Sequence, residues 1–314
     1  MFIGIGINIV SSFLSFVSKT FNAYKARVIA AGGTVEAEAC ATAAMNAIDV
    51  QGLLSSATMY LSPSGYKGNT MYAQIPSNGN GDLTYSRLSD MTRVNSAGNI
   101  EVLGCNLIKY SQLFSDATWT KSASSIGVDT TTAPDGTTAY PLLENATSTT
   151  HQCFQSITTG VITSATHTAT IYVKPHDVTA RNLAIRIQDN AFTYGSIIAV
   201  FNPSTGALVT SSTGGGGVIE STSSVLIGGW YRIIVSFRIP SSTAFRCDII
   251  LYNGTTMSYA GNDPNTTPTG VYIWGAQLET GSTASTYIPT TNAAAALPPI
   301  DYSLGGCPCF LVEP

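Results

Sequence analysis

The chain has 314 residues, and only 10% of them are Asp, Glu, Lys or Arg, against roughly 25% in an average soluble domain. The formal net charge of -4 provides no basic surface with which to neutralise phosphates, which argues against nucleic acid as a partner. Hydrophobic residues make up 44%, and short polar residues and glycine are abundant, as is typical of secreted or assembled β proteins. The length suits one main β domain with attached segments.

Residues 1–55 are expected to form a segment for attachment and oligomerisation. Residues 2–17, FIGIGINIVSSFLSFV, carry no charge. They lack the basic start and the small-residue cleavage pattern of a signal peptide, and they are shorter and more polar than the roughly 20 apolar residues of a membrane-spanning helix. We therefore expect this apolar stretch to dock onto another subunit and not to cross a membrane.

Two periodicities compete in this stretch. Isoleucines at positions 3, 5, 7 and 9 alternate as in a β-strand, whereas apolar residues at 3, 7, 10, 14, 17 and 21 follow the spacing of a helical seam. We expect a strand followed by a short helix. The residues assigned to the assembly interface are Ile3, Ile5, Ile7, Val10, Phe13, Leu14 and Val17.

A packing helix is predicted over residues 34–49, TVEAEACATAAMNAID. Thr34 can cap its first turn, where Glu36 and Glu38 suit the helix dipole. Residues 56–104 contain the turn-forming stretches SPSGYKGN, IPSNGNGDL and VNSAGNI, separated by apolar pairs. This pattern predicts an extended connector with small hairpins.

Short strands divided by Gly, Pro, Asn and Ser are predicted over residues 105–291. WYRIIVSF (230–237) and FRCDIILY (245–252) alternate apolar and polar residues, with Arg246 and Asp248 facing outward. No crossover helix separates the strands, which excludes a parallel α/β fold. The sequence predicts a mainly β fold, an antiparallel jelly-roll sandwich of half-buried strands, followed by a C-terminal tail over 292–314.

The stretch GVYIWGAQLETGSTASTYIPTT, residues 270–291, is predicted to begin as a central strand. The first half of residues 271–278 is apolar on both alternating faces, as in a strand covered on both sides. Its aromatic residues are therefore expected in the core, and Glu279 is expected where the strand emerges into solvent.

No catalytic or metal-binding constellation is visible in the sequence. His151, His167 and His176 lack metal-ligand spacing and are expected on the surface. The six cysteines, spread from Cys40 to Cys309, are expected to be mostly buried free thiols. The run Gly214–Gly217 is expected to be a hairpin or flexible loop. We therefore predict a non-enzymatic protein with no cofactor and no metal.

A glycosidase would need two carboxylates facing each other across a cleft. The acidic residues that could be considered for that role are better explained by turns and strand edges; they are Asp135, Glu220, Asp248 and Glu279. A polysaccharide depolymerase is therefore the weakest of the functions considered. A carbohydrate-binding module needs exposed aromatic rings beside polar groups, and four residues are candidates for that role: Trp119, Phe192, Tyr194 and Tyr259.

Several motifs resemble bacteriophage virion proteins. They occur in one order over residues 80–291, and they are DLTYSRLSDMTRVNSAGNIE (82–101), NLIKYSQLFSDATWTK (106–121), TTAPDGTTA (131–139), IYVK (171–174), GGWYRI (228–233), YIWGAQLETGS (272–282) and STYIPTT (285–291). In that family these motifs accompany a jelly roll similar to carbohydrate-binding modules or concanavalin. The closing IDYSLGGCPCFLVEP also resembles a segment of such proteins.

The resemblance implies a structural component of the virion exterior, such as a head fibre, spike or tail fibre, assembled in the cytoplasm of the bacterial host. It further implies a homo-oligomer, often a trimer, that contacts other virion proteins through its N-terminus and displays the jelly roll outside. The alternative function, which is compatible with the first, is adhesion to a host surface glycan. The shared motif residues, including Trp230, Trp274 and Glu279, are expected to form the fold.

Overall fold

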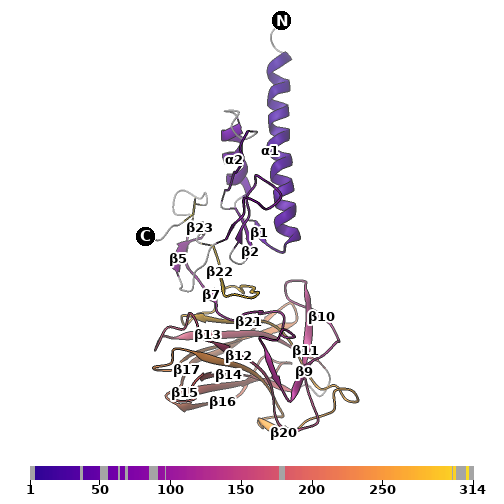
Figure 1. Cartoon of the computed structure of the whole chain (residues 1–314), viewed down its shortest axis with the longest axis vertical. Coiled ribbons are helices and arrows are strands. Elements are labelled where there is room, and N and C mark those ends of the chain that lie inside the picture. The colour runs from indigo at the N-terminus through magenta and orange to yellow at the C-terminus, as the bar shows by residue number, and fades with distance from the viewer. Residues whose placement is uncertain are drawn as a thin grey trace. The chain divides into compact units, whose positions relative to one another are not determined.

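The structure is a computed structural model that describes residues 4–35, 38–49, 56–62, 64–67, 70–84, 91–95, 97–176, 181–298, 300–301 and 309–310. The chain divides into two compact units (Figure 1). The first comprises Met1–Arg87, Met91–Leu103 and Ala296–Pro314, and the second comprises Leu88–Asp90 and Gly104–Ala295.

Helix α1, Gly4–Ala30, dominates the first unit. The prediction of a strand at its start is wrong, because the seam spacing of four and three residues continues through Val17, Phe21, Tyr24 and Val28, all of which are buried. Only a helix places all of these residues on one face. The helix ends at a left-handed glycine, Gly32, whose N–H donates to the carbonyl of Ile29.

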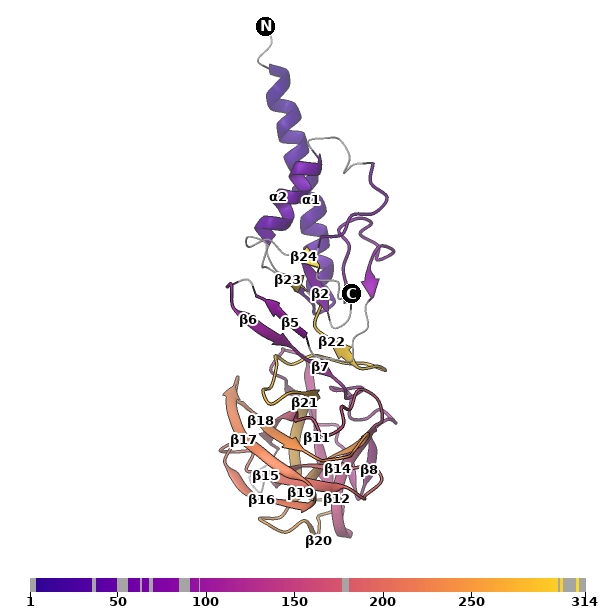
Figure 2. The same ribbon diagram turned by 90° about the vertical axis from the view of Figure 1, so that its left-hand side faces the viewer.

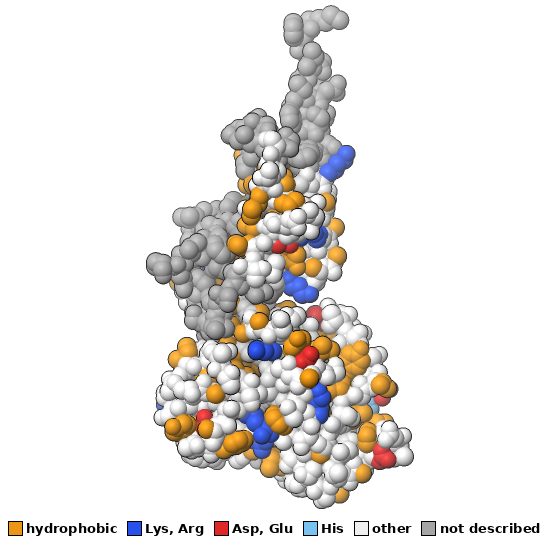
Figure 3. Space-filling model, viewed as in Figure 1, with side chains coloured by type: hydrophobic (Ala, Val, Ile, Leu, Met, Phe, Trp, Pro, Cys, Tyr) orange, Lys and Arg blue, Asp and Glu red, His pale blue; other side chains and the backbone are white. Residues whose placement is uncertain are grey.

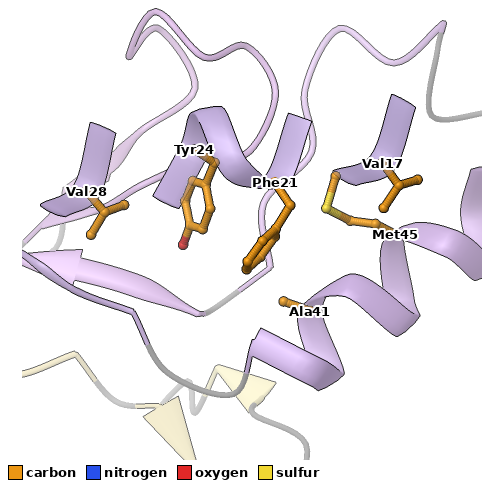
Figure 4. Close-up of a cluster of buried hydrophobic side chains, with 6 residues drawn as sticks. All are labelled: Val17, Phe21, Tyr24, Val28, Ala41 and Met45. Atoms are coloured by element: carbon orange, nitrogen blue, oxygen red, sulfur yellow. The ribbon is translucent and has the colours of Figure 1, made fainter. Parts of the chain in front are cut away.

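The buried seam of α1 packs on a second helix, α2, Glu38–Asp49 (Figure 4). Ala41 and Met45 of α2 complete the cluster. This helix confirms the predicted packing role but begins later than expected, because Thr34 lies in strand β1 opposite Tyr66 and does not cap it. Val17, which was assigned to the assembly interface, is instead buried inside this unit. Ile3 lies outside the described residues, and α1 includes the other predicted interface positions.

Short strands complete the first unit. A four-stranded antiparallel sheet has the order β1-β2-β3-β4, and two separate hairpin-like pairs join β5 to β6 and β23 to β24. The bounds are β1 Thr34–Val35, β2 Gly65–Lys67, β3 Thr70–Met71, β4 Leu83–Thr84, β5 Met91–Val94, β6 Ile100–Leu103, β23 Ile300–Asp301 and β24 Cys309–Phe310.

Side-chain hydrogen bonds join α1 to the segments next to these strands. The Tyr24 hydroxyl lies 3.1 Å from Ser64 Oγ, and burial raises the pKa of Tyr24 to about 12. Arg27 donates to both carboxylate oxygens of Asp82 and to the carbonyl of Ala73. A residue larger than glycine at 65 would place its Cβ 2.1 Å from the Tyr24 hydroxyl, so the close approach requires Gly65.

Cysteine chemistry differs between the two units. Cys153 and Cys247 are buried free thiols, as predicted, and burial raises the pKa of both. Cys40 in α2 is disulfide-bonded, so the expectation of a free thiol is wrong there. No helix among the described residues has the length and hydrophobicity needed to cross a membrane.

The second unit is an antiparallel jelly-roll sandwich, as the sequence predicts. Its first sheet has the order β10-β11-β21-β13-β18-β17, with β9 beside β11, and its second has the order β16-β15-β14-β19-β12-β20, with β8 beside β12 (Figure 2). The bounds are β7 Cys105–Asn106, β8 Thr120–Ser122, β9 Ser124–Ile126, β10 Thr131–Thr132, β11 Thr138–Glu144, β12 Ser148–Ile157, β13 His167–Pro175, β14 Asn182–Asp189, β15 Gly195–Phe201, β16 Leu208–Gly215, β17 Val218–Ile227, β18 Trp230–Arg238, β19 Phe245–Tyr252, β20 Ser258–Ala260, β21 Gly270–Thr280 and β22 Ala295–Ala296.

Aromatic contacts between the sheets define the core. Phe237 of β18 and Phe245 of β19 have ring centroids 5.5 Å apart, and His167 of β13 packs on both rings. The surface position predicted for His167 is therefore wrong, and burial lowers the pKa of its imidazole. His176, also predicted on the surface, has a largely covered side chain that packs against Tyr272.

The central strands of the first sheet, β13 and β21, are covered on the outer side as well, so these two strands are not half-buried, whereas the edge strand β17 is largely exposed. Trp230, Tyr172 and Trp274 form an aromatic cluster there, with Tyr287 packed on Trp274. The predicted central strand is confirmed, because β21 pairs with both β11 and β13. The segment after β21, which includes Tyr287, folds back over this side of the sheet, and the periodicity of the strands does not predict that contact.

Glu279 is buried, which contradicts the predicted emergence into solvent. It accepts hydrogen bonds from Gln277 Nε2 at 2.8 Å and from the Ser285 N–H at 2.9 Å. Burial raises the pKa of its carboxyl. Of the two alternatives predicted for the run Gly214–Gly217, the hairpin is wrong: Gly214 and Gly215 end β16, and the next two glycines connect it to β17 of the other sheet.

Truncating the seam of α1 tests the helical unit. Phe21→Ala removes a buried ring that contacts Tyr24, so we expect a loss of about 3–5 kcal/mol in the free energy of unfolding of this unit. Ile29→Ala, on the same helix but 57% exposed, is the matched control and should change it little. Hydrogen exchange resolved along the chain would locate the effect, and equal protection of α1 in both variants would contradict the packing described.

Candidate functional site

The outer face of the second sheet carries polar and aromatic side chains that contact one another. Phe245 points into the core, so the residues that alternate with it along β19 point away from the core. Arg186 of β14, Asp248 of β19 and Phe154 of β12 are directly opposite one another in register. This surface is called the outer face below; its members include Gln152, Phe154, Ser156, Ala184, Arg186, Gln188, Ser196, Ile198, Val200, Thr210, Ser212, Arg246, Asp248, Ile250 and Tyr252.

The carboxylate of Asp248 holds the centre of the outer face. Arg246 Nε donates to Asp248 Oδ1 at 2.8 Å, and Arg186 Nε donates to Oδ2 at 3.2 Å. Gln188 Nε2 lies 3.3 Å from Oδ2, and Arg186 Nη2 also reaches Gln152 Oε1 at 3.0 Å. Asp248 is 0% exposed, so the predicted solvent-facing position is wrong: the two arginines lie over it.

The guanidinium of Arg246 lies against two aromatic rings. Its Cζ is 3.6 Å from the centroid of the Phe154 ring and 5.9 Å from that of Phe192. Asp248 fixes the plane of the guanidinium from one edge, while Phe154 supports one of its flat sides. A rigid polar and aromatic surface results, with Phe192 at its margin.

Phe192 lies in the loop between β14 and β15. Its φ of 57° lies in the left-handed region, which bulky residues rarely adopt. Asp189 stabilises the loop, because its Oδ2 accepts from the Thr193 N–H at 3.0 Å and its Oδ1 from Ser242 Oγ at 2.8 Å. Burial opposes ionisation of Asp189, but these hydrogen bonds outweigh it and lower the pKa of the carboxyl. Phe192 itself is 65% exposed.

An apolar cluster extends the outer face away from Phe192. Ala184, Val200, Ile250 and Tyr252 are buried there, and Ile198 and Met257 pack against them. Arg186 Nη1 approaches the sulfur of Met257 at 4.0 Å. The face therefore combines an apolar part, a charged centre and an exposed ring.

Two of the four predicted sugar-binding residues lie at this site. Phe192 contacts Arg246, and Tyr194 belongs to the same loop, where its N–H lies 3.4 Å from Asp189 Oδ2 and its side chain is exposed. Trp119 lies elsewhere and is 1% exposed, packed on Phe114 with its Nε1 donating to the carbonyl of Tyr110 at 3.1 Å. Its ring has no free face for a sugar.

Tyr259 lies in a buried ionic cluster and not on the outer face. Its hydroxyl donates to Glu144 Oε2 at 2.7 Å, and Arg181 binds both oxygens of the same carboxylate at 2.8 Å. His151 packs on the Tyr259 ring and is also buried, so its predicted surface position is wrong. Burial opposes ionisation of Glu144, but its hydrogen-bond partners outweigh burial and lower its pKa.

Sequence reasoning did not select Phe154, Arg186 or Arg246 for the site. A usable signal was present, because a chain with only 10% charged residues places Arg186, Arg246 and Asp248 in the middle of apolar strands. What was missing was the pairing of β14 with β19 and of β19 with β12, which brings the three strands into register. Among the described residues, no group of three or more His, Cys, Asp or Glu side chains is placed to hold a metal ion.

Comparisons with known proteins give distant structural likenesses. No protein-family model matches the chain, and no curated protein matches it. Solved structures that resemble it include the enzymatically active domain of bacteriophage CBA120 tailspike protein 4, with 12% identity, a TM-score of 0.32 and coverage of 56% of this chain but 21% of that one. The first xylan-binding CBM22 domain of Paenibacillus barcinonensis Xyn10C has 13% identity and a TM-score of 0.34, with 58% and 97% covered.

A third solved structure is a putative sugar-binding protein from Bacteroides thetaiotaomicron. It has 12% identity and a TM-score of 0.31, and the match covers 56% of this chain and 100% of that one. The chain thus spans about a fifth of the tailspike domain's length but nearly all of the two sugar-binding proteins.

Replacing Glu144 tests the ionic cluster around Tyr259. The lowered pKa means that ionised Glu144 contributes stability above the ordinary value of 4.5, and that this contribution is lost as the pH falls. Glu144→Gln should lower the free energy of unfolding by about 3 kcal/mol at pH 7 and by much less at pH 3. Glu220→Gln, which alters a more exposed pair with Arg238, is the control. Denaturant unfolding at both pH values would measure this, and a loss independent of pH would refute the assignment.

Proposed function

We propose that the chain binds a carbohydrate on the outer face of the second sheet. The observation that supports this most directly is the Arg246 guanidinium, held by Asp248 and lying against the rings of Phe154 and Phe192. Sugars are recognised by stacking of their C–H faces on aromatic rings and by hydrogen bonds from fixed polar groups. Phe192 supplies the exposed ring, and the two arginines and two glutamines supply the polar groups.

Preorganisation of the site supports the same proposal. The Asp189 carboxylate fixes the loop that carries Phe192, and Asp248 fixes both guanidinium groups before any ligand arrives. Binding therefore orders few side chains, which lowers its entropic cost.

The proposed activity is recognition without turnover. Glycoside hydrolysis ordinarily uses two carboxylates placed across the scissile bond. On the outer face the described residues include one carboxylate, Asp248, and it is already engaged by Arg186 and Arg246. The arrangement suits binding of an intact glycan.

We further propose that the protein is a homo-oligomeric component on the exterior of a phage particle, attached through its N-terminal unit. The order of the sequence motifs supports this, as does the length of α1. With 27 residues, α1 is about 40 Å long, whereas its partner α2 has 12 residues and is about 18 Å long. The described packing between the two helices involves Val17–Val28 of α1, and we propose that the part of α1 before Val17 binds another subunit.

Removal of the Phe192 ring tests the carbohydrate proposal. Phe192→Ala should weaken binding to whichever immobilised bacterial surface polysaccharide the wild type retains by about tenfold or more, since a stacked ring contributes roughly 1–2 kcal/mol. Tyr140→Ala, which removes an exposed ring from the first sheet, should bind as the wild type does. Affinity electrophoresis in polysaccharide gels measures both, and equal retardation of the two variants would count against the outer face.

Shortening α1 tests the attachment proposal. A chain lacking residues 1–16 keeps the whole cluster from Val17 to Met45 and should fold, but it should run as a monomer where the full chain forms an oligomer, expected to be a trimer. Native mass spectrometry gives the copy number. An unchanged oligomer mass would place the interface elsewhere, and the shortened chain should still bind carbohydrate because its sandwich is intact.

A further inference from the structure

The outer face carries an unbalanced charge. Its charged members are Arg186, Arg246 and Asp248, so two guanidinium groups share one carboxylate and the face has a net charge of +1. The other residues of the face are uncharged. By contrast, the buried carboxylate of Glu144 is matched one to one by Arg181. The outer face therefore differs from a simple structural ion pair.

Arg246 has donor capacity to spare. Its Nε and Nη2 both reach Asp248 Oδ1, at 2.8 and 2.7 Å, while its Nη1 has no hydrogen-bond acceptor among the described residues. Arg186 is more fully used, since its Nε and Nη2 bind Asp248 and Gln152. Thus Arg246 can bind a further acceptor without giving up its present partner.

The position of Arg246 suits an anionic acceptor. Only about a sixth of its side chain is exposed, 16%, and Phe154 covers one flat side of the guanidinium. A partly desolvated guanidinium forms stronger hydrogen bonds with a charged acceptor than one in open water. The ring of Phe192, close to the same group, would place a sugar ring beside it.

We infer that the ligand of the outer face is an acidic saccharide whose carboxylate is bound by Arg246 while its ring stacks on Phe192. This inference rests on the proposed carbohydrate binding and narrows it to sugars such as hexuronates. It assigns the two residues different roles: Phe192 contacts the sugar ring whether or not the sugar is charged, and Arg246 binds the carboxylate and so distinguishes acidic from neutral sugars.

Matched pairs of oligosaccharides test the inference with the full chain. Each probe is an oligosaccharide that contains hexuronate, printed on an array beside the same oligosaccharide after reduction of its carboxyl groups to alcohols. Wild type should bind at least one acidic member about tenfold more tightly than its neutral partner, the scale of a hydrogen bond to a charged group. Arg246→Gln should remove this preference. Arg238→Gln, a more exposed arginine of the first sheet, should preserve it.

The outcomes separate the inference from the proposal beneath it. If the wild type binds the neutral and acidic members equally, and Phe192→Ala weakens binding of both equally, the preference for acidic saccharides is overturned. Carbohydrate binding on the outer face would still be supported. Arg246→Lys separates charge from geometry: it should retain part of the preference and lose the planar contact with Phe154. Binding to no member of any pair by wild type would overturn both proposals.

Discussion

The buried carboxylate of Asp248 is the constraint on which the outer face depends. It lies in β19, at the middle of its sheet, where an unpaired charge would be very unfavourable. Arg186 and Arg246 compensate it, and in doing so they are held flat against the sheet. This explains why the Arg246 guanidinium lies 3.6 Å from the centre of the Phe154 ring: its bonds to Asp248 along one edge restrict the positions that it can adopt. The rigidity of the candidate site is therefore a consequence of satisfying one charge.

The same device recurs at other places in the chain. Glu144 is enclosed by Arg181 and Tyr259 at one end of the sandwich, and Asp82 is bound by Arg27 in the helical unit. The described surface drawn in Figure 3 shows few charged side chains among uncharged polar groups. A chain with so few charges uses several of them as partly buried pairs that fix one element against another. Uncharged side chains such as those of Ser, Thr and Asn can form hydrogen bonds with water where charged groups are few.

Periodicity predicted the strands well because alternation is a property of each strand by itself. The apolar runs at 230–237 and 245–252 became β18 and β19, and the doubly apolar run after Gly270 became a central strand. Burial of the polar faces was not predictable in this way. Gly104 lies close to the Glu279 carboxylate, and Phe237 and Phe245 pack on His167, so both residues are covered by chain far away in sequence that no local pattern encodes. For the site, an exposed aromatic loop was recognisable at Phe192, whereas Arg186 and Arg246 required strand pairing.

The backbone at Phe192 offers an argument about function that does not depend on any ligand. A bulky residue with a φ of 57° costs on the order of 1 kcal/mol relative to glycine at the same position. Packing of the ring does not offset that cost, because the ring is 65% exposed. The Asp189 carboxylate that stabilises the loop binds the backbone N–H groups of Thr193 and Tyr194, and a glycine at 192 would keep these bonds. Stability alone would thus favour glycine here. The phenylalanine places an apolar ring beside Arg246 at the margin of the outer face, and recognition of a ligand gives that placement a physical reason.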